Sequence, residues 1–181
     1  MDEDFRLETE RLRLRRYRQE DLEDLHAMFS NPEHMRWYPE PFPREGTQEW
    51  LDRQIAGYRD RGWALLIVED RETGDFLGTA GPALLLVEGV EEVEIGWHTR
   101  PGRKGEGVAP EAAAAARNWA FANLEVDHLI SLVRPENRPS GRVAEKIGMQ
   151  VDREVDHKGL RHNVYRIDRI TWARTHEGGR P

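Results

Sequence analysis

The sequence predicts a single domain of the α/β (α+β) class, in which strands and helices share one core. Its 181 residues fit one domain, since domains typically have about 100 to 200 residues. Strand-like and helix-like segments follow one another along the chain, and a glycine-rich loop at 100–107 runs directly into an alanine-rich helical segment. We expect the domain to span residues 1–174 and the tail, 175–181, to be frayed.

The composition excludes several classes of protein. Hydrophobic residues make up 38% of the chain and charged residues 34%, which indicates a well-solvated surface. No run reaches the roughly 20 apolar residues of a membrane span, and the start of the chain lacks a signal peptide's basic and apolar regions. The absence of cysteine excludes disulfides, a thiol nucleophile and thiolate metal sites. We therefore expect a soluble cytoplasmic protein, and its net charge of −7 favours cationic partners over nucleic acid.

The first third of the chain predicts a strand and two helices. From Leu7 to Arg15 leucine and arginine alternate, as in a half-solvated strand, and the arginine row is read as a charged edge. The segments Glu20–Ser30 and Thr47 to about Arg59 have helical spacing of apolar residues. The proline-rich stretch 34–43 is expected to lack regular structure. Its aromatic residues either line the substrate side or pack into the core.

The rest of the chain predicts six more strands and two more helices. The expected strands are Trp63–Glu69 and Phe76–Ala80, joined as a hairpin by a turn at 71–74, then Val90–His98, His128–Val133, Val151–His157 and Asn163–Ile170. One helix follows the glycine-rich loop, with Pro110 in its first turn. Its residues Ala112, Ala116, Trp119 and Ala120 share a face that is expected to pack on a sheet. The other helix, Arg138–Lys146, is closed by Gly148.

The glycine-rich loop predicts an anion-binding site. Gly102, Gly105 and Gly107 let the backbone turn tightly and approach a ligand, and the following helix adds unpaired N–H groups and a partial positive charge. A P-loop is excluded because no Gly-Lys-Ser/Thr ends the loop, and a dinucleotide motif because Pro110 occupies a Gly or Ala position. The alternative is an ordinary glycine turn before a helix.

Within this loop, Lys104-Gly-Glu-Gly-Val-Ala-Pro-Glu-Ala resembles the pyrophosphate-binding signature of the GNAT N-acetyltransferases, Gln/Arg-x-x-Gly-x-Gly/Ala. Gly107 and Ala109 match it, whereas Lys104 replaces the usual Gln or Arg. Five further segments resemble the RimJ/RimL-like branch of that family in the same order. They are Thr9-Glu-Arg-Leu-Arg-Leu-Arg, Asn31-Pro-Glu-His-Met-Arg-Trp, Phe76-Leu-Gly-Thr-Ala-Gly, Glu94-Ile-Gly-Trp and Asn137-Arg-Pro-Ser-Gly-Arg-Val-Ala-Glu-Lys-Ile-Gly. Pro110 and Met149 depart from the family pattern, in which Thr and an aromatic residue are usual.

The resemblance covers nearly the whole chain and implies a mixed, mostly antiparallel sheet of about seven strands with helices on both faces. It also implies that the two central strands splay apart and that acetyl-CoA lies in the gap. The residues that would bind the cofactor are Gly96, Trp97, His98, Lys104, Gly105, Glu106, Gly107, Val108, Ala109, Pro110, Asn137 and Ser140. The seven histidines show no paired metal spacing, so no metal is inferred.

The strand at 90–98 carries the expected chemistry, because a period of two puts Glu94, Gly96 and His98 on one face. By resemblance, Glu94 is the candidate general base, acting through water, and His98 is a weaker candidate; a backbone amide polarises the thioester carbonyl. The alternative is a solvent-facing polar stripe. The family motif Asn-x-x-Ser, which the chain resembles at 137–140, implies that Ser140 protonates or stabilises the leaving thiolate and that Asn137 bonds the cofactor arm. The alternative for these two is that they only form the start of a helix.

We therefore expect an acetyl-CoA-dependent N-acetyltransferase that acts by direct transfer on a primary amine, either of a small molecule or of a protein N-terminus. The alternative is a CoA-binding sensor or assembly module without catalysis. Nucleic-acid binding by the arginine row is a distant third, since no basic patch with interleaved aromatic residues supports it. Neither a membrane nor a metal is expected as a partner, and the protein is expected to be a monomer or homodimer.

Overall fold

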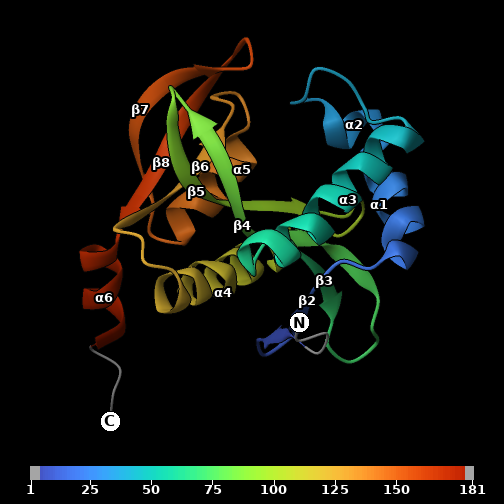
Figure 1. Cartoon of the computed structure of the whole chain (residues 1–181), viewed down its shortest axis with the longest axis horizontal. Coiled ribbons are helices and arrows are strands. Elements are labelled where there is room, and N and C mark those ends of the chain that lie inside the picture. The colour runs from blue at the N-terminus through green and yellow to red at the C-terminus, as the bar shows by residue number, and fades with distance from the viewer. Residues whose placement is uncertain (1–4, 178–181) are drawn as a thin grey trace.

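A computed structural model describes residues 5–177 and shows one open sheet between helices (Figure 1). The strand order is β1-β2-β3-β4-β5-β6-β8-β7, in which β5 and β6 are parallel and all other neighbours antiparallel. The strands are β1 (Arg6–Glu8), β2 (Leu12–Arg15), β3 (Leu66–Asp70), β4 (Phe76–Val87), β5 (Val90–Thr99), β6 (His128–Val133), β7 (Gln150–His157) and β8 (Leu160–Asp168). The helices are η1 (Gln19–Asp21), α1 (Leu22–Phe29), α2 (Pro32–Met35), α3 (Arg44–Arg61), α4 (Val108–Asn123), α5 (Arg138–Lys146) and α6 (Arg169–Glu177). The predicted mixed, mostly antiparallel sheet is confirmed.

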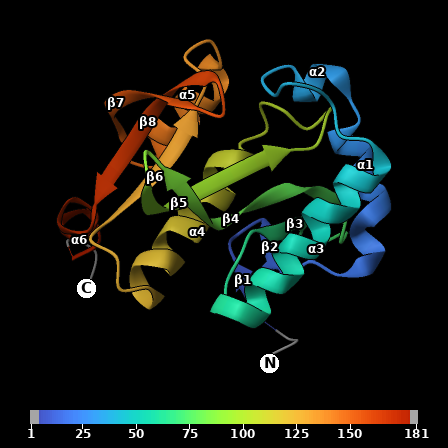
Figure 2. The same cartoon turned by 45° about the horizontal axis from the view of Figure 1, so that its top comes forward.

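Helices cover both faces of the sheet, as predicted. The long helices α3 and α4 lie on opposite sides of it, with α1 beside α3 (Figure 2). On α4, the predicted face is buried: Ala112, Ala116 and Ala120 are at most 1% exposed, and Trp119 packs against the cluster that contains Ala116 and Ala120. The small side chains let α4 lie close to the sheet and bring its N-terminus beneath the central strands.

The N-terminal strand is the first correction, and it accounts for eight strands where about seven were expected. The predicted strand from Leu7 to Arg15 is split into β1 and β2, which pair with each other as a hairpin. Thr9 makes the reversal, because its hydroxyl accepts from the N–H of Leu12 at 2.9 Å while its N–H donates to the Leu12 carbonyl at 2.9 Å. Such a local turn leaves the alternation of leucine and arginine intact, so the pattern did not reveal it.

The helices after β2 differ in their bounds from the prediction: α1 is shorter than the expected Glu20–Ser30, α2 is additional and α3 is longer than expected. The predicted end of the first helix at Asn31 is confirmed, but Asn31 at once caps the short helix α2 by accepting from the N–H groups of Glu33 and His34. The expectation of no regular structure at 34–43 is therefore wrong for the residues within α2. Pro32 occupies the first turn, where its missing N–H costs nothing. Likewise α3 begins at Arg44, three residues before the expected start.

The strand β4 is much longer than the predicted segment Phe76–Ala80, because it continues to Val87 and pairs with β5 along its whole length. Pro82 made the extension hard to predict. It is tolerated because the ladder between β3 and β4 ends at the pair Leu66 with Ala80, so β4 is an edge on that side from there on. At Gly81 the backbone of Leu65 passes so close that a Cβ would lie 2.9 Å from its Cα.

The C-terminal end differs most from the prediction. The strand expected to reach Ile170 ends at Asp168, and the chain continues as α6, which the sequence reading missed. Arg169 explains the change of course, since its guanidinium donates to the carbonyls of Phe121, Leu124 and Val126 at the end of α4. Of the tail expected to be frayed, 175–177 belong to α6, and 178–181 lie outside the described residues.

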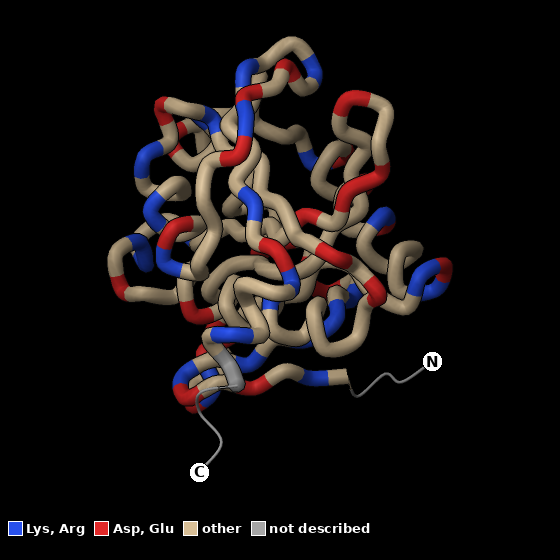
Figure 3. Tube along the Cα trace, turned by 90° about the vertical axis from the view of Figure 1, so that its left-hand side faces the viewer, with Lys and Arg blue, Asp and Glu red and all other residues tan. Residues whose placement is uncertain are grey.

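On the side of the molecule seen in Figure 3, lysine and arginine residues are interspersed with aspartate and glutamate residues. On the first strands, the arginine row predicted as a charged edge is paired: Arg13 with Glu8, and Arg15 with Asp21 and Glu69. No helix within residues 5–177 combines the length and the apolarity that crossing a membrane requires.

Candidate active site

The centre of the site is the divergence of β5 and β6. In the described chain their ladder consists of a single register pair, Glu94 with Ile130. Beyond it, side chains replace the backbone ladder: the Ser131 hydroxyl donates to the Ile95 carbonyl at 2.7 Å, and the Leu132 N–H donates to Glu94 Oε1 at 3.0 Å. Because buried backbone groups need partners, these two contacts hold the closed end of the splay.

The predicted faces of β5 are confirmed. Ile95 lies in the cluster formed with α4, and Val93 and Trp97 pack against it. Glu94 and Gly96 share the other face, where a Cβ on Gly96 would lie 3.7 Å from Glu94 Oε2 and 3.4 Å from Leu65 Cδ2. Gly96 therefore leaves bare backbone beside the carboxylate, at the point where the two strands begin to part.

The Glu94 carboxylate is half-buried, and its burial raises its pKa to about 7, against the opposing effects of the Leu132 N–H and Lys158. Desolvation disfavours the charged form of a carboxyl group. Near neutral pH, Glu94 therefore exists in both protonation states. A group in that condition is well matched to accepting a proton in this pH range and releasing it again.

His98 lies at the other end of the same face, within a cluster of rings. Its ring centroid is 5.1 to 6.2 Å from those of Phe29, His34, Tyr38 and Trp50. Burial, followed by the proximity of His34, lowers the pKa of His98 to about 3. His98 is thus neutral at physiological pH and a much weaker base than Glu94. The face of β5 is also covered here by α1, α3 and the loop after α2, so it is not an open polar stripe.

Tyr38, in the loop after α2, was not singled out from the sequence. Its Oη lies 3.2 Å from Nε2 of His98, and desolvation of the hydroxyl, followed by the Glu94 charge, raises its pKa above the usual value. Tyr38 therefore remains a neutral hydroxyl beside His98. Its side chain is 39% exposed, whereas Phe42 of the same loop packs on Phe29 and Trp50. The loop thus does both things that the sequence left open: Phe42 joins the core and Tyr38 faces the site.

His34 is a second residue that sequence reasoning missed. Burial, followed by Lys104, lowers its pKa to about 4. Both its ring nitrogens are buried, and neither has a hydrogen-bond partner within residues 5–177.

On the other side of the site, Lys158 occupies the turn between β7 and β8 with a positive φ of 54°. In both Figure 1 and Figure 2 this turn and the loop after α2 face each other across the ends of the central strands.

The loop predicted to bind an anion has the required backbone. Gly102, Gly105 and Gly107 have φ values of 87°, 90° and 84°, in the left-handed region that favours glycine. Gly107 is the N-cap of α4, with no side-chain cap. The first turn of a helix leaves its N–H groups without helical acceptors. Since Pro110 has no N–H, Val108 and Ala109 offer the free donors, while Lys104, Gly105 and Glu106 are exposed on the loop.

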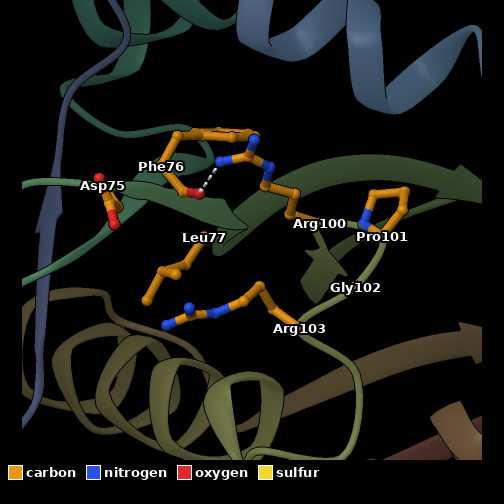
Figure 4. A pocket seen from close by; sticks show the side chains of 7 residues that line it. All are labelled: Asp75, Phe76, Leu77, Arg100, Pro101, Gly102 and Arg103. Atoms are coloured by element: carbon orange, nitrogen blue, oxygen red, sulfur yellow. Dashed lines mark hydrogen bonds between the residues drawn. The ribbon is translucent and has the colours of Figure 1, made fainter.

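A pocket of about 270 Å³ lies under the first half of this loop (Figure 4). It is lined by Asp75, Phe76, Leu77, Arg100, Pro101, Gly102 and Arg103. Arg100 donates to the Phe76 carbonyl at 3.3 Å, and Arg103 Nε lies 3.0 Å from a carboxylate oxygen of Glu106. The pocket shares no residue with the face of β5 that holds Glu94, and we do not assign it to the chemistry.

The helix α5 has the predicted bounds and begins just beyond the end of β6. Asn137 is its N-cap, since its Oδ1 accepts from the Ser140 N–H at 3.3 Å. Asn137 therefore caps α5. Capping uses only the carbonyl oxygen of Asn137 and the backbone of Ser140. The Asn137 amide nitrogen and the Ser140 hydroxyl form no hydrogen bond with the described part of the chain.

No group of three or more His, Asp or Glu side chains within the described residues is arranged to hold a metal ion. The departures from the family pattern are accommodated by the fold. Met149 is buried, with its sulfur 3.3 Å from the Ser131 hydroxyl oxygen, and Pro110 stands in the first turn of α4. Neither departure disturbs the loop or the splay.

Comparison with known proteins identifies the family of the chain. Residues 11–150 match the model of the acetyltransferase (GNAT) domain. The uncharacterized protein YkkB of Bacillus subtilis is 33% identical over 86% of this chain and 91% of its own. The crystal structure of an acetyltransferase from Agrobacterium tumefaciens superposes with a TM-score of 0.80 and 32% identity, covering 90% of this chain and 94% of that one.

At the level of the fold, spermidine N-acetyltransferase from Vibrio cholerae, solved with CoA and spermine, has a TM-score of 0.72 at 19% identity and covers 91% of this chain and 99% of its own. The family expected from the sequence motifs is confirmed by the domain match and by the two relatives above 30% identity. The chain belongs to the GNAT family of acetyltransferases.

Proposed function

We propose that the protein transfers an acetyl group from acetyl-CoA directly to a primary amine. The observation that carries this proposal is the position of Glu94. A carboxyl group with a pKa of about 7 lies beside the bare backbone of Gly96, where β5 and β6 part. An amine attacks a thioester only in its neutral form, so a base of this strength at this place serves the reaction.

The residues present fit the cofactor. The N–H groups of Gly107, Val108 and Ala109 suit a diphosphate at the start of α4, with Lys104, Gly105, Glu106 and Pro110 completing the loop. The divergence of β5 and β6 exposes the edge of β5 at Gly96, Trp97 and His98, where the backbone can hydrogen-bond to the amide groups of the pantetheine arm. The amide nitrogen of Asn137 is a further donor for that arm. When bound, acetyl-CoA supplies an acetyl group activated as a thioester.

The residues would then divide the reaction between them. Transfer would form a bond from the amine nitrogen to the acetyl carbon and break the bond from that carbon to sulfur. Glu94, directly or through a bound water, would take the proton that the amine loses, and a backbone N–H of β5 would stabilise the carbonyl oxygen. The Ser140 hydroxyl would give a proton to the departing sulfur and regain one from solvent.

The acceptor would enter between the loop after α2 and the turn that carries Lys158. One wall is aromatic and uncharged, because His34 and His98 are neutral and Tyr38 keeps its proton. We propose a primary amine as acceptor, either of a small molecule or at a protein N-terminus. The alternative function is a CoA-binding sensor or assembly module, which the same loop and splay would permit.

Turnover of acetyl-CoA with a panel of amines separates these functions. A thiol reagent that reports free CoA is well suited, because the chain contains no cysteine and every thiol detected comes from the cofactor. The panel should include alkyl amines, polyamines, amino acid amides and short peptides with free N-termini. Amine-dependent thiol release supports the enzyme. Tight CoA binding by calorimetry without release across the panel supports the sensor.

A further inference from the structure

The turn between β1 and β2 is clamped onto the start of α4. Glu111, in the first turn of that helix, accepts from the Thr9 hydroxyl at 2.5 Å and from the Arg11 N–H at 3.2 Å. The Arg11 guanidinium donates to the same carboxylate through Nε at 2.8 Å and through one terminal nitrogen at 2.6 Å. Its other terminal nitrogen donates to the Glu106 carbonyl at 3.0 Å. One arginine thus holds both the loop and the helix that follows it.

The contact with the Glu106 carbonyl fixes the orientation of a peptide group. No cis peptide occurs in the described chain, and in a planar trans peptide the C=O and the N–H point in opposite directions. Because the Glu106 oxygen points to Arg11, the N–H of Gly107 points away from the β1–β2 turn. Gly107 also gives Arg11 room, since a Cβ there would lie 3.1 Å from a guanidinium nitrogen.

The contacts with Glu111 answer a problem of charge. A carboxylate in the first turn stabilises a helix, but it repels an anion that binds at the same helix end. Burial alone would raise the pKa of Glu111, but the hydrogen bonds from Thr9 and Arg11 outweigh it and hold the pKa below its usual value. Glu111 is therefore ionised, and Arg11 compensates its charge while tying it to the side of the β1–β2 turn.

We infer that Arg11 is a positioning residue for the diphosphate of CoA: it orients the Gly107 N–H and neutralises Glu111, so that the start of α4 can accept an anion. This inference rests on the proposed binding of CoA at the loop. It assigns to the Thr9-Glu-Arg segment a role in cofactor binding although Arg11 itself is 52% exposed and lies about 100 positions before Glu111 in the sequence.

The test compares two acetyl donors in Arg11→Gln. Acetyl-CoA contains the diphosphate, whereas S-acetylpantetheine ends before it. We expect the Kd for CoA and the KM for acetyl-CoA to rise about tenfold, as for the loss of hydrogen bonds to a charged group. The KM for S-acetylpantetheine should stay within about twofold of wild type, which is near the limit of such measurements. Arg13→Gln is the matched control, because Arg13 pairs with Glu8 on the same hairpin and should change neither value.

A second variant keeps the test decisive if Arg11→Gln folds poorly. In Arg11→Gln/Glu111→Gln the uncompensated carboxylate is gone, so we expect CoA affinity to recover part of the loss. A merely structural clamp would give no recovery, since the double variant lacks both charged partners. Unchanged CoA affinity in Arg11→Gln, or an equal loss with both donors, would overturn the inference. Failure of the wild-type protein to bind CoA would overturn the proposed function as well, and the two failures are distinguishable.

Discussion

Glu94 reaches across the divergence of β5 and β6, where its Oε1 accepts a hydrogen bond of 3.0 Å from the backbone N–H of Leu132. The bond fixes one carboxylate oxygen and leaves Oε2 near the open side of Gly96. A general base has to be held in place while it keeps a free lone pair for the incoming proton. The same residue thus closes the strand ladder and faces the space where the acceptor amine is proposed to lie.

Glu94→Gln should slow acetylation most for strongly basic amines. Deprotonating an amine at pH 7 costs about 1 kcal/mol for an α-amine of pKa near 7.8 and about 4.6 kcal/mol for a lysine-like amine near 10.4. The substitution keeps an oxygen that can accept from Leu132, so the splay is preserved. We therefore expect a large loss of kcat/KM for alkyl amines and a small one for α-amines.

The pH profile of kcat/KM provides the check on Glu94. As the pH falls through about 7, Glu94 becomes protonated and can no longer take a proton. The kcat/KM of the wild type should therefore fall on the acidic limb of its pH profile. Glu94→Gln lacks that limb, and its deficit should shrink as the pH rises toward the pKa of the acceptor. Parallel profiles with a small constant offset would remove Glu94 from the mechanism and leave solvent as the proton acceptor.

Gly107→Val should abolish CoA binding in a folded protein. Valine at a φ of 84° is strained by about 1 to 2 kcal/mol, and its Cβ would meet the guanidinium of Arg11 at 3.1 Å. Gly62→Val is the matched control, because Gly62 has a φ of 85° at the end of α3 and no atom within 4 Å of a new Cβ. Both variants should lose similar stability in thermal unfolding, but calorimetry should show lost CoA affinity in Gly107→Val alone. Lys104→Ala should weaken binding only modestly, because the loop binds mainly through backbone N–H groups.

Ser140→Ala tests the proton donor to the leaving thiolate. The cap of α5 uses the Ser140 N–H, which alanine retains, so the melting temperature should be nearly unchanged. We expect kcat to fall by about 10²-fold, the lower range for general acid catalysis, while CoA affinity stays the same. An unaltered kcat would reduce Ser140 to a residue of the first helical turn.

The features predicted well from the sequence are those set by near neighbours along the chain. The two faces of β5 follow from a period of two, and the bounds of α5 follow from Asn137 at its start and Gly148 beyond its end. Patterns of this kind depend on residues two to four positions apart, which the sequence displays directly. The loop before α4 belongs to the same group, because its glycines need positive φ values.

The features that were missed depend on residues far apart in the sequence. Tyr38 meets His98 across 60 positions, and no local pattern distinguishes it from Phe42, which packs into the core. Arg169, the residue after β8, donates to the Phe121 carbonyl near the end of α4, so the strand ends before its predicted limit and α6 begins. Such long-range hydrogen bonds override a local strand pattern, because they satisfy carbonyl groups that would otherwise lack partners.

His98→Gln asks whether the histidine takes part in proton transfer. The pKa of His98 is about 3 and that of Glu94 about 7, so His98 binds a proton about 10⁴-fold more weakly, at one power of ten for each pKa unit. Glutamine can still hydrogen-bond to Tyr38 Oη, so the aromatic wall should stay in place. We expect kcat/KM to stay within about fivefold of wild type, the size of a packing change of about 1 kcal/mol, and the limb near pH 7 to persist. Tyr38→Phe is the companion variant: it keeps the ring but removes the hydroxyl, and it should raise KM for the amine without changing CoA affinity. His98 would instead be the base if His98→Gln lowered kcat/KM a hundredfold and removed the limb near pH 7, while the separate variant Glu94→Gln retained that limb.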